Sequence, residues 1–304
     1  MDKIATIIVH YNTKTDTDNT LESLSKIKSG PFEHQIFVVD NGSKEAYELP
    51  KKTPAQTTLI SSAKNLGFTG GNNLGFKRAQ ENFDPDFYLL LNSDTLVQPD
   101  FLNHLYQELK NNPRLGIVSP LIYFAPGCEF HAQSYSKAEK GQVIWFAGGI
   151  FDWPNLSTFH LGVDEINRDQ FSLYPPKFDF ATGCCFLMRR EIYETVGGFD
   201  DRYFLYYEDA DLSARVTKAG YQLGLCSQSQ IWHLNGGSGG GVGSDLQCYY
   251  MNRNRLLFNW LHGHWRSKIT TLRLALQLLM SENRIEQIAA RHFFICHFGK
   301  QVYI

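Results

Sequence analysis

Hydrophobic residues in the first part of the chain occur as short runs without a helical period, and each run ends in small polar residues. Continuous apolar runs of this length are typical of strands that are buried on both faces. The clearest runs are Ile4–His10, Ile36–Val39 and Tyr88–Leu91. Between them, apolar residues recur every three or four positions, which indicates helices near 16–28, 72–81 and 99–109. This alternation predicts an α/β fold.

The pattern is less regular between residues 124 and 178, where Trp145, Trp153 and many Phe residues lie among glycines and prolines. Because loops often carry the residues that determine substrate specificity, we expect this region to hold a binding site for an acceptor substrate. The alternative interpretation is a β-hairpin excursion that covers the sheet edge. Regular elements return afterwards, with strands expected near 184–188, 221–225 and 231–233 and helices near 190–196, from 208 and from 247 onward.

The run Tyr88–Leu91 ends abruptly in Asn92, Ser93 and Asp94. Ligands of open α/β sheets bind outside the carboxyl ends of the strands, which would place Asp94 at the mouth of a crevice. The same three residue types are common in turns, so a simple turn is an equally good interpretation of this stretch alone.

A second strand-end acid, Asp40, is followed by Asn41 and Gly42. In nucleotide-binding α/β folds such an acid commonly takes up a ribose hydroxyl or a base edge, although the triplet taken alone also fits a turn. Further on, the glycines of 65–76 would let the backbone approach a ligand, and the helix expected from Asn72 would offer free N–H groups. This segment is a candidate nucleotide cradle.

Acids gather again at Glu208, Asp209 and Asp211, in the first turn of an expected helix. The helix dipole favours acids there by ~0.3–1 kcal/mol each, which accounts for one or two of them. Tyr206 and Tyr207 lead into the cluster and would place it in a partly apolar wall, where a carboxylate could be tuned as a base.

His233 closes an apolar strand and precedes a glycine-rich stretch. A lone histidine is more often structural than catalytic, but with Asp94 it could hold Mg²⁺ or Mn²⁺, which fills its coordination sphere with substrate phosphates. These parts together fit displacement of a nucleoside diphosphate from a sugar. The metal would neutralise the leaving group while a carboxylate of the 208–209 pair takes the proton of an attacking hydroxyl.

Composition narrows the classes of partner and compartment. The 304 residues carry a net charge of -2, which gives no argument for nucleic-acid binding. Six cysteines without a C-x-x-C pair indicate reduced thiols of a cytosolic protein. The N-terminus runs directly into a strand pattern without a leader, and no stretch reaches the ~18–20 apolar residues of a membrane span, so we expect a soluble protein.

The C-terminal segment has a different charge balance. Residues 249–304 contain eight basic residues and two acids, on helical segments that also bear tryptophan and leucine. A basic amphipathic segment suggests a peripheral membrane contact. Helices that pack on the domain with a solvated basic face, or that form a homo-oligomer contact, explain the pattern equally well.

The motifs, in this order, resemble those of family 2 glycosyltransferases of the GT-A fold, and most closely the bacterial rhamnosyltransferase branch. The resemblance spans roughly residues 4–255 and rests on Ile7–Asn12, Val38–Ser43, Asn65–Asn72, Leu91–Asp94, Gly197–Asp200, Tyr207–Leu212, His233 and Tyr249–Asn254. It implies a Rossmann-like mixed sheet flanked by helices. The domain would cover 1–245, with a nucleotide-binding half of about 1–120 and an acceptor half of about 121–245, followed by a helical, basic extension at 246–304.

The resemblance also implies roles for single residues. Asp94 and His233 would ligate the metal, Asp40 would contact the nucleobase or ribose, and Asp209 would be the general base with Glu208 beside it. Asn92 replaces the first acid of a full D-x-D element, which lowers the negative charge of the metal site. The further residues expected to bind the donor are Tyr11, Asn41, Asn65, Gly67, Gly71, Asn72, Asn92 and Arg253.

The function implied is inverting, metal-dependent sugar transfer in cell-surface polysaccharide synthesis, such as that of lipopolysaccharide or cell wall. The branch favours dTDP-L-rhamnose as donor before a UDP-sugar, and a saccharide or lipid-linked acceptor. The protein would be cytoplasmic, with a peripheral contact on the inner face of the plasma membrane. A catalytically silent partner that binds sugar nucleotides is the rival hypothesis, but such a partner would not need Glu208, Asp209 and His233.

Overall fold

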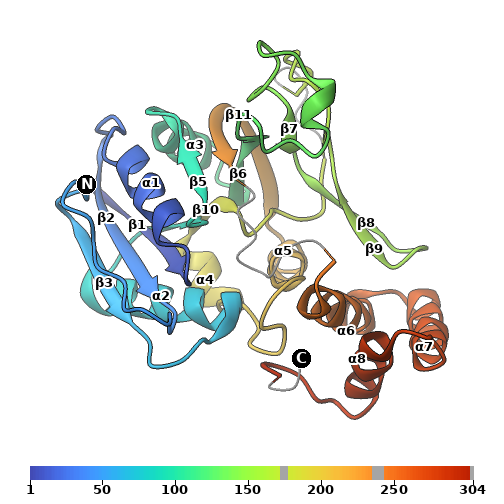
Figure 1. The fold of residues 1–304 in the computed structure, drawn as a ribbon. Coiled ribbons are helices and arrows are strands. Elements are labelled where there is room, and N and C mark those ends of the chain that lie inside the picture. The colour runs from blue at the N-terminus through green and yellow to red at the C-terminus, as the bar shows by residue number, and fades with distance from the viewer. Residues whose placement is uncertain (172–176, 235–242, 302–304) are drawn as a thin grey trace.

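The computed structural model describes residues 1–171, 177–234 and 243–301. Within these ranges a mixed sheet of nine strands runs through the molecule in the order β3-β2-β1-β4-β10-β6-β11-β5, with β7 paired to β6 (Figure 1). Its strands are β1 (Asp2–His10), β2 (Phe32–Asp40), β3 (Thr57–Ser61), β4 (Phe87–Leu91), β5 (Thr95–Val97), β6 (Leu115–Phe124), β7 (Ile144–Phe146), β10 (Cys185–Arg189) and β11 (Gln222–His233). The predicted α/β class is confirmed.

Helices cover both faces of the sheet because successive side chains of a buried strand point to opposite sides. Ile8 and Leu89 pack with α1 and α3, whereas Ile7 and Tyr88 pack with α2, α4 and α5. The helices are α1 (Lys14–Leu24), α2 (Gly67–Asn82), α3 (Phe101–Asn111), α4 (Arg190–Val196), α5 (Glu208–Lys218), α6 (Asp245–His262), α7 (Trp265–Leu279), α8 (Arg284–Phe294) and the short 3₁₀ helix η1 (Ala132–Ser134).

Strand register brings distant chain segments to one edge of the sheet. β1 pairs in parallel with both β2 and β4, and His10 lies opposite Asp40. β10 runs antiparallel to β4, with Cys185 opposite Leu91, so β10 begins where β4 ends. The backbone N–H of Asn92 donates to the carbonyl of Cys184 at 2.8 Å across this junction. The carboxyl ends of β1, β2 and β4 therefore meet the start of β10.

The irregular region contains the hairpin that one interpretation predicted. Strands β8 (Gly149–Asp152) and β9 (Ser157–His160) form a separate two-stranded sheet, which extends towards the C-terminal helices in Figure 1. The Trp153 ring stacks on Phe258 of α6, with ring centroids 5.6 Å apart. The hairpin therefore packs against α6.

The helices predicted at the C-terminal end are confirmed, but packing does not change at residue 245. Leu257 and Phe258 of α6 belong to the main core, whereas Leu256 on the same helix packs with α7 and α8. We therefore propose that α6 is part of the catalytic domain and that a separate extension, if one is drawn, begins with α7. No helix in the described part of the chain is long and apolar enough to cross a bilayer.

Candidate active site

Asp94 and His233 lie beside each other at the sheet edge. Asp94 stands in the short turn between β4 and β5, and His233 ends β11 opposite Thr95. Nε2 of His233 is 3.2 Å from Oδ1 of Asp94, and both side chains are buried. The N–H of Leu234 donates to the carbonyl of Asp94 at 2.8 Å and fixes the two segments together. The stretch 92–94 is thus a turn, and it also positions the carboxylate of Asp94 beside the imidazole of His233.

The His233 ring is held by an aromatic neighbour that sequence reasoning did not single out. The ring centroid of Trp145, on β7, lies 4.5 Å from that of His233 and 4.7 Å from that of His160. Burial lowers the pKa of His160 to about 4, so that ring is neutral near pH 7. Trp145 therefore links the irregular region to the Asp94–His233 pair.

The donor set fits a hard divalent cation that completes its shell with substrate. A carboxylate oxygen and an imidazole nitrogen are available, while the described residues contain no group of three or more His, Cys, Asp or Glu arranged to hold a metal. Mg²⁺ binds through one or two protein ligands plus substrate phosphates in such sites. The pair could therefore hold Mg²⁺ or Mn²⁺ together with a diphosphate.

Asp16 of α1 is a further carboxylate near this pair. Burial raises the pKa of Asp16, and the negative charge of Asp94 raises it further. Burial also raises the pKa of the Cys128 thiol, with added contributions from Glu129, Asp16 and Asp94. Negative charge therefore accumulates around Asp94 and favours a cation there. No local motif marked Asp16, because its proximity to Asp94 depends on how α1 packs.

Asp209 lies in the first turn of α5 and is fixed by two backbone donors. Its Oδ2 accepts a hydrogen bond from the N–H of Gly183 at 2.9 Å, and its Oδ1 accepts one from the N–H of Ala210 at 2.8 Å. The side chain is only partly buried, in contrast to its neighbour Glu208. Asp209 is therefore a rigidly placed carboxylate that keeps access to solvent.

Glu208 and Asp209 divide the charge unequally. Burial, and then the charge of Asp209, hold the pKa of Glu208 well above its ordinary value. Burial also raises the pKa of Asp209, but the N–H donors of Gly183 and Ala210 oppose the shift. Among the described residues, Oε2 of Glu208 has no hydrogen-bond partner. The negative charge of the pair therefore resides on Asp209, which is the ionised carboxylate that is free to accept a proton.

The turn that leads into these acids is strained. Phe204, Tyr206 and Tyr207 all have left-handed backbones, with φ of 65°, 68° and 69°. Each left-handed non-glycine residue costs about 1–2 kcal/mol and persists only where surrounding contacts enforce it. The contacts here come from Asn254 of α6, whose Nδ2 lies within 2.9 Å of the carbonyls of Tyr203, Leu205 and Tyr206.

Arg253, expected to bind the donor, is fully buried beside Asn254. Its guanidinium donates to the carbonyls of Arg202, Tyr203 and Gly299 at 2.7–2.9 Å. These contacts favour a positioning role for Arg253 at the 202–206 turn over direct contact with nucleotide. Asn254 was missed as a functional residue, although it belongs to the quoted motif.

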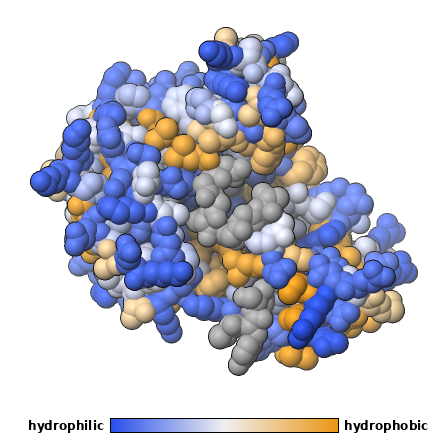
Figure 2. Space-filling model, viewed as in Figure 1, coloured by the Kyte–Doolittle hydropathy of each residue, from blue (hydrophilic) through white to orange (hydrophobic). Residues whose placement is uncertain are grey.

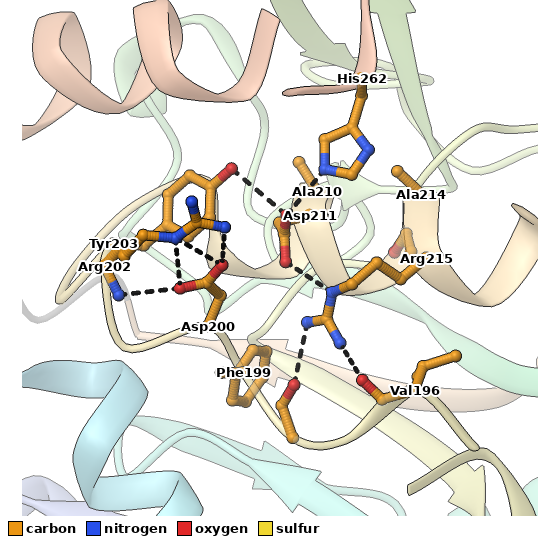
Figure 3. A network of polar contacts seen from close by, with 12 residues as sticks. Val196, Phe199, Asp200, Arg202, Tyr203, Ala210, Asp211, Ala214, Arg215 and His262 are labelled. Carbon is orange, nitrogen blue, oxygen red and sulfur yellow. Dashed lines mark hydrogen bonds and ion pairs between the residues drawn. The ribbon is translucent and has the colours of Figure 1, made fainter. Parts of the chain in front are cut away.

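A polar network around Asp211 anchors α5, and it includes the turn through the hydroxyl of Tyr203, which donates to Oδ1 of Asp211 at 3.3 Å (Figure 3). The buried Asp211 accepts a hydrogen bond from Nε of Arg215 at 2.8 Å and lies 2.7 Å from Nε2 of His262, at the end of α6. Arg215 in turn donates to the carbonyls of Val196 and Gly198. The network ties the helix that carries Asp209 to both α4 and α6.

Asp40 caps a turn at the nucleotide side of the sheet edge. Its carboxylate accepts hydrogen bonds from the N–H groups of Ser43 and Tyr47 at 3.1 and 3.0 Å. Burial alone would raise the pKa of Asp40, but these donors outweigh it and hold the pKa below its ordinary value. Asp40 is therefore an ionised acceptor at the end of β2.

Asn41 and Asn65 shape the entry to α2. Asn41 accepts from the N–H of Leu66 at 3.0 Å and donates to the carbonyl of Gly67 at 2.9 Å, while Oδ1 of Asn65 accepts from the N–H of Gly67 at 2.7 Å. Tyr11 and Asn92 follow β1 and β4 and are half-buried. Donor contact through these four residues stays a prediction.

The glycines of this segment are helical, which corrects the expected loop followed by a helix from Asn72. α2 already begins at Gly67, whose φ of 76° starts the turn. A Cβ on Gly71 would lie 2.9 Å from Val9, so Gly71 lets α2 pack closely on β1. Asn72 is buried and donates to the carbonyl of Phe68. The stretch expected after His233 lies at 235–242, outside the described residues.

Asp40 and Asp94 thus follow the carboxyl ends of β2 and β4, and Asp209 is bonded to the segment before β10. The chain as a whole also matches a known family. Residues 2–258 match the model described as "Glycosyltransferase like family 2". The chain belongs to this family. It is accordingly a glycosyltransferase, which uses a nucleotide-sugar donor and an acceptor substrate.

Curated relatives of this glycosyltransferase include two rhamnosyltransferases. It is 25% identical over 288 residues to the N-acetylglucosaminyl-diphospho-decaprenol L-rhamnosyltransferase of Mycobacterium tuberculosis, covering 91% of both chains. It is 25% identical over 232 residues to the rhamnosyltransferase WbbL of Escherichia coli, covering 74% of this chain and 76% of that one. The low-salt glycan biosynthesis hexosyltransferase Agl10 of Haloferax volcanii is 24% identical over 306 residues, at 98% and 91% coverage.

Among solved structures, the fold is similar to that of GalNAc-T7, crystallised with UDP, GalNAc and Mn²⁺. The TM-score is 0.65 at 15% identity, over 97% of this chain and 55% of that chain. The likeness confirms the predicted GT-A fold.

Proposed function

We propose that this glycosyltransferase transfers L-rhamnose from dTDP-L-rhamnose to a hydroxyl of a saccharide or lipid-linked acceptor, with inversion and with Mg²⁺ or Mn²⁺. The observation that supports the mechanism is that the segments bearing both acids are tied to the two residues before β10. Asp209 accepts a hydrogen bond from the N–H of Gly183, and the N–H of Asn92, two residues before Asp94, donates to the carbonyl of Cys184. The proposed base and the proposed metal ligand would therefore serve the same end of β10.

The geometry suggests a single displacement. Asp209 would accept the proton of the acceptor hydroxyl while the hydroxyl oxygen forms its bond to the anomeric carbon. The bond from that carbon to the diphosphate breaks on the opposite face, and the nucleoside diphosphate departs with its electron pair. A divalent metal held by Asp94 and His233 would neutralise that leaving charge. Asp40 and the turn at Asn41 and Asn65 would orient the nucleoside.

The donor and acceptor assignments are supported by the names of two relatives. Both are rhamnosyltransferases, and the mycobacterial name specifies a diphospho-decaprenol acceptor. The hexosyltransferase name of the archaeal relative favours a UDP-hexose as the second candidate. The six cysteines are all free thiols, which supports a reducing compartment such as the cytoplasm. We therefore propose that the protein works in the cytoplasm, at the inner face of the plasma membrane. Its proposed role there is in the synthesis of a cell-surface polysaccharide.

A donor screen tests the proposal directly. The purified protein would be mixed with dTDP-L-rhamnose or with UDP-hexoses, each with Mg²⁺, Mn²⁺ or EDTA, and its melting temperature measured beside donor hydrolysis. A ligand that binds only the folded state raises the melting temperature. We expect the largest rise, and hydrolysis, with dTDP-L-rhamnose and metal. A larger response to a UDP-hexose would replace the donor, and binding without turnover with any donor or sugar acceptor would favour the silent partner.

A further inference from the structure

The exposed face of α7 is more hydrophobic than its buried face. Its outward positions recur at helical spacing and form one stripe. They are Trp265, Arg266, Ile269, Leu272, Arg273, Leu276, Gln277 and Met280, the last at the C-terminal cap. The buried positions on the other side are Ser267, Thr271, Ala275 and Leu278, and the half-buried Leu274 and Leu279 pack with them. An ordinary surface helix has the reverse arrangement, so the core does not account for this stripe.

The stripe is long and strongly exposed. Trp265, Leu276 and Met280 are 67%, 53% and 77% exposed, and Ile269 and Leu272 lie between them. Fifteen residues of helix separate the two ends, which corresponds to roughly 22 Å. Single exposed apolar residues are normal, but a contiguous apolar patch on a folded protein marks an interaction site. In the view of Figure 2 hydrophobic residues gather at the centre and in the lower part of the face, whereas the side over β1–β3 and much of the right edge, where α7 lies, are hydrophilic. The stripe on α7 is therefore defined by its exposed fractions.

Cations border the stripe, and α7 contains no acidic residue. The guanidinium of Arg266 lies 5.1 Å from the ring centroid of Trp265. Nζ of Lys268 lies 5.7 Å from the ring of Trp260, an exposed residue near the end of α6. Tryptophan beside lysine or arginine is typical of the membrane interface, where the ring enters the headgroup region and the cation meets anionic lipid.

We infer that this stripe, extended by Trp260, docks the protein on an anionic membrane surface, with α7 lying in the plane of the headgroups. The charges favour lipid over a second copy of the chain, because a face packed on itself would bring Arg266 and Arg273 of two copies together. Anionic lipids, in contrast, complement the same cations. The inference stands apart from the donor assignment, and its test does not use transfer activity.

Flotation with lipid vesicles tests the surface. The full chain would be mixed with vesicles of phosphatidylcholine alone or with added phosphatidylglycerol. We expect it to float with the anionic vesicles, and to float less at about 1 M salt, where the screening length falls to about 3 Å. The combined substitutions Trp265→Ser, Leu272→Ser and Leu276→Ser should reduce binding at least tenfold, and Arg266→Gln with Arg273→Gln should remove the preference for anionic lipid.

Controls keep the test decisive. Phe159→Ser with Val163→Ser removes exposed apolar side chains from another surface and should bind vesicles as wild type does. Each variant should keep the wild-type melting temperature, since the changed residues are exposed. Equal flotation of the triple variant, or no flotation of the wild type, would overturn the inference. A wild-type dimer that becomes a monomer in the triple variant, measured by light scattering, would assign the stripe to a second copy.

Discussion

The backbone N–H of Gly183 donates to Oδ2 of Asp209 at 2.9 Å, so a residue two positions before β10 fixes the carboxylate at the start of α5. A rigid acceptor at that point is what a general base requires, since its proton transfer depends on position before pKa. Gly183 comes 26 residues before Asp209 in the chain. The interaction therefore exists only in the folded protein. Substitution of Asp209 and substitution of Gly183 should each affect the proposed base.

Asp209→Asn should reduce transfer by 10²–10⁴-fold, the usual contribution of a general base, while donor binding stays near wild type. Single-turnover transfer and donor titration measure the two effects separately. Glu194→Gln, an exposed carboxylate on α4, serves as the control and should leave both unchanged. Substantial turnover in Asp209→Asn would remove this residue from the role of base.

The pH profile should report the same group. Because burial raises the pKa of Asp209, its base form is lost on acidification at a pH above its ordinary value of 3.8. We expect kcat/KM to fall on the acidic side with an apparent pKa above that value. In Gly183→Ala the added Cβ would lie 3.1 Å from Phe68 and would displace the N–H that donates to Asp209. The acidic limb of the kcat/KM profile of this variant should therefore move. An unmoved limb would show that the Gly183 contact does not tune the base.

Asp94→Asn should weaken metal binding and diphosphate binding together, because one change removes a charge that serves both. Titration of activity with Mn²⁺ should show at least a tenfold higher metal requirement. A loss of metal affinity of this size is usual when the residues around a metal site are changed. His233→Gln should act in the same direction. Full activity of the wild type in EDTA would contradict a metal at this pair.

Asn254→Ala should lower kcat more than it raises KM for the sugar-nucleotide donor, since the amide holds the turn before Glu208. Its Nδ2 donates to three backbone carbonyls of that turn, and its Oδ1 accepts from the guanidinium of Arg253. Asn259→Ala is a matched control on the same helix: it is also buried and bonds to the carbonyls of Leu156 and Arg255. Both variants should lose stability, by about 1–3 kcal/mol. Only Asn254→Ala should lose kcat, and an equal loss in both would reduce Asn254 to a purely structural role.

Glu208→Gln should stabilise the protein at neutral pH. A carboxyl whose folded pKa is raised above its unfolded value contributes fully only below the unfolded pKa, and its contribution is lost as pH rises. Glu208 therefore costs stability at pH 7, and the amide removes that cost. The melting temperature of the variant should exceed that of wild type at pH 7 and converge with it near pH 4. A variant that is less stable at pH 7 would refute the assigned direction.

Asp211→Ala should destabilise the fold strongly, because it leaves Arg215 and His262 without their shared carboxylate. Removing one partner of a buried ion pair costs about 3–5 kcal/mol, which corresponds to a melting temperature lower by about 10 °C. Glu194→Ala breaks a surface pair with Arg190 and should cost at most about 1 kcal/mol. Similar losses in both variants would show that the Figure 3 network adds little.

The strands and the strand-end acids were predictable because their signals are local. The runs before Asp40 and Asp94 are apolar over several residues and stop abruptly. Because the strands pair in parallel, their ends lie at the same edge of the sheet. The start of α2 at Gly67 was not predictable, since glycine disfavours helices. The glycines are explained by the close approach to β1, where a Cβ on Gly71 would lie 2.9 Å from Val9 and one on Gly75 would lie 2.3 Å from Ile7. Packing against β1 overrides the local preference.

The roles of Arg253 and Asn254 were out of reach for a different reason. Their partners are carbonyls about fifty residues earlier, and a carbonyl carries no sequence signature. Likewise, Trp145 is one aromatic among many until β7 pairs with β6 and brings it to His233. Residue type indicated the chemistry of the site, whereas non-local pairing determined which side chains serve it.

The position of β10 has a consequence for how the chain matures. β10 separates β4 from β6 in the sheet but is made some sixty residues after β6. While the chain grows, the apolar strands β4 and β6 each leave an edge unpaired, and such edges invite association with other chains. Residues 1–120 would thus make a poor independent fragment despite holding most of the nucleotide side. Synthesis of β10 and α5 would close that edge and deliver Asp209 at the same stage, whereas His233 follows only with β11.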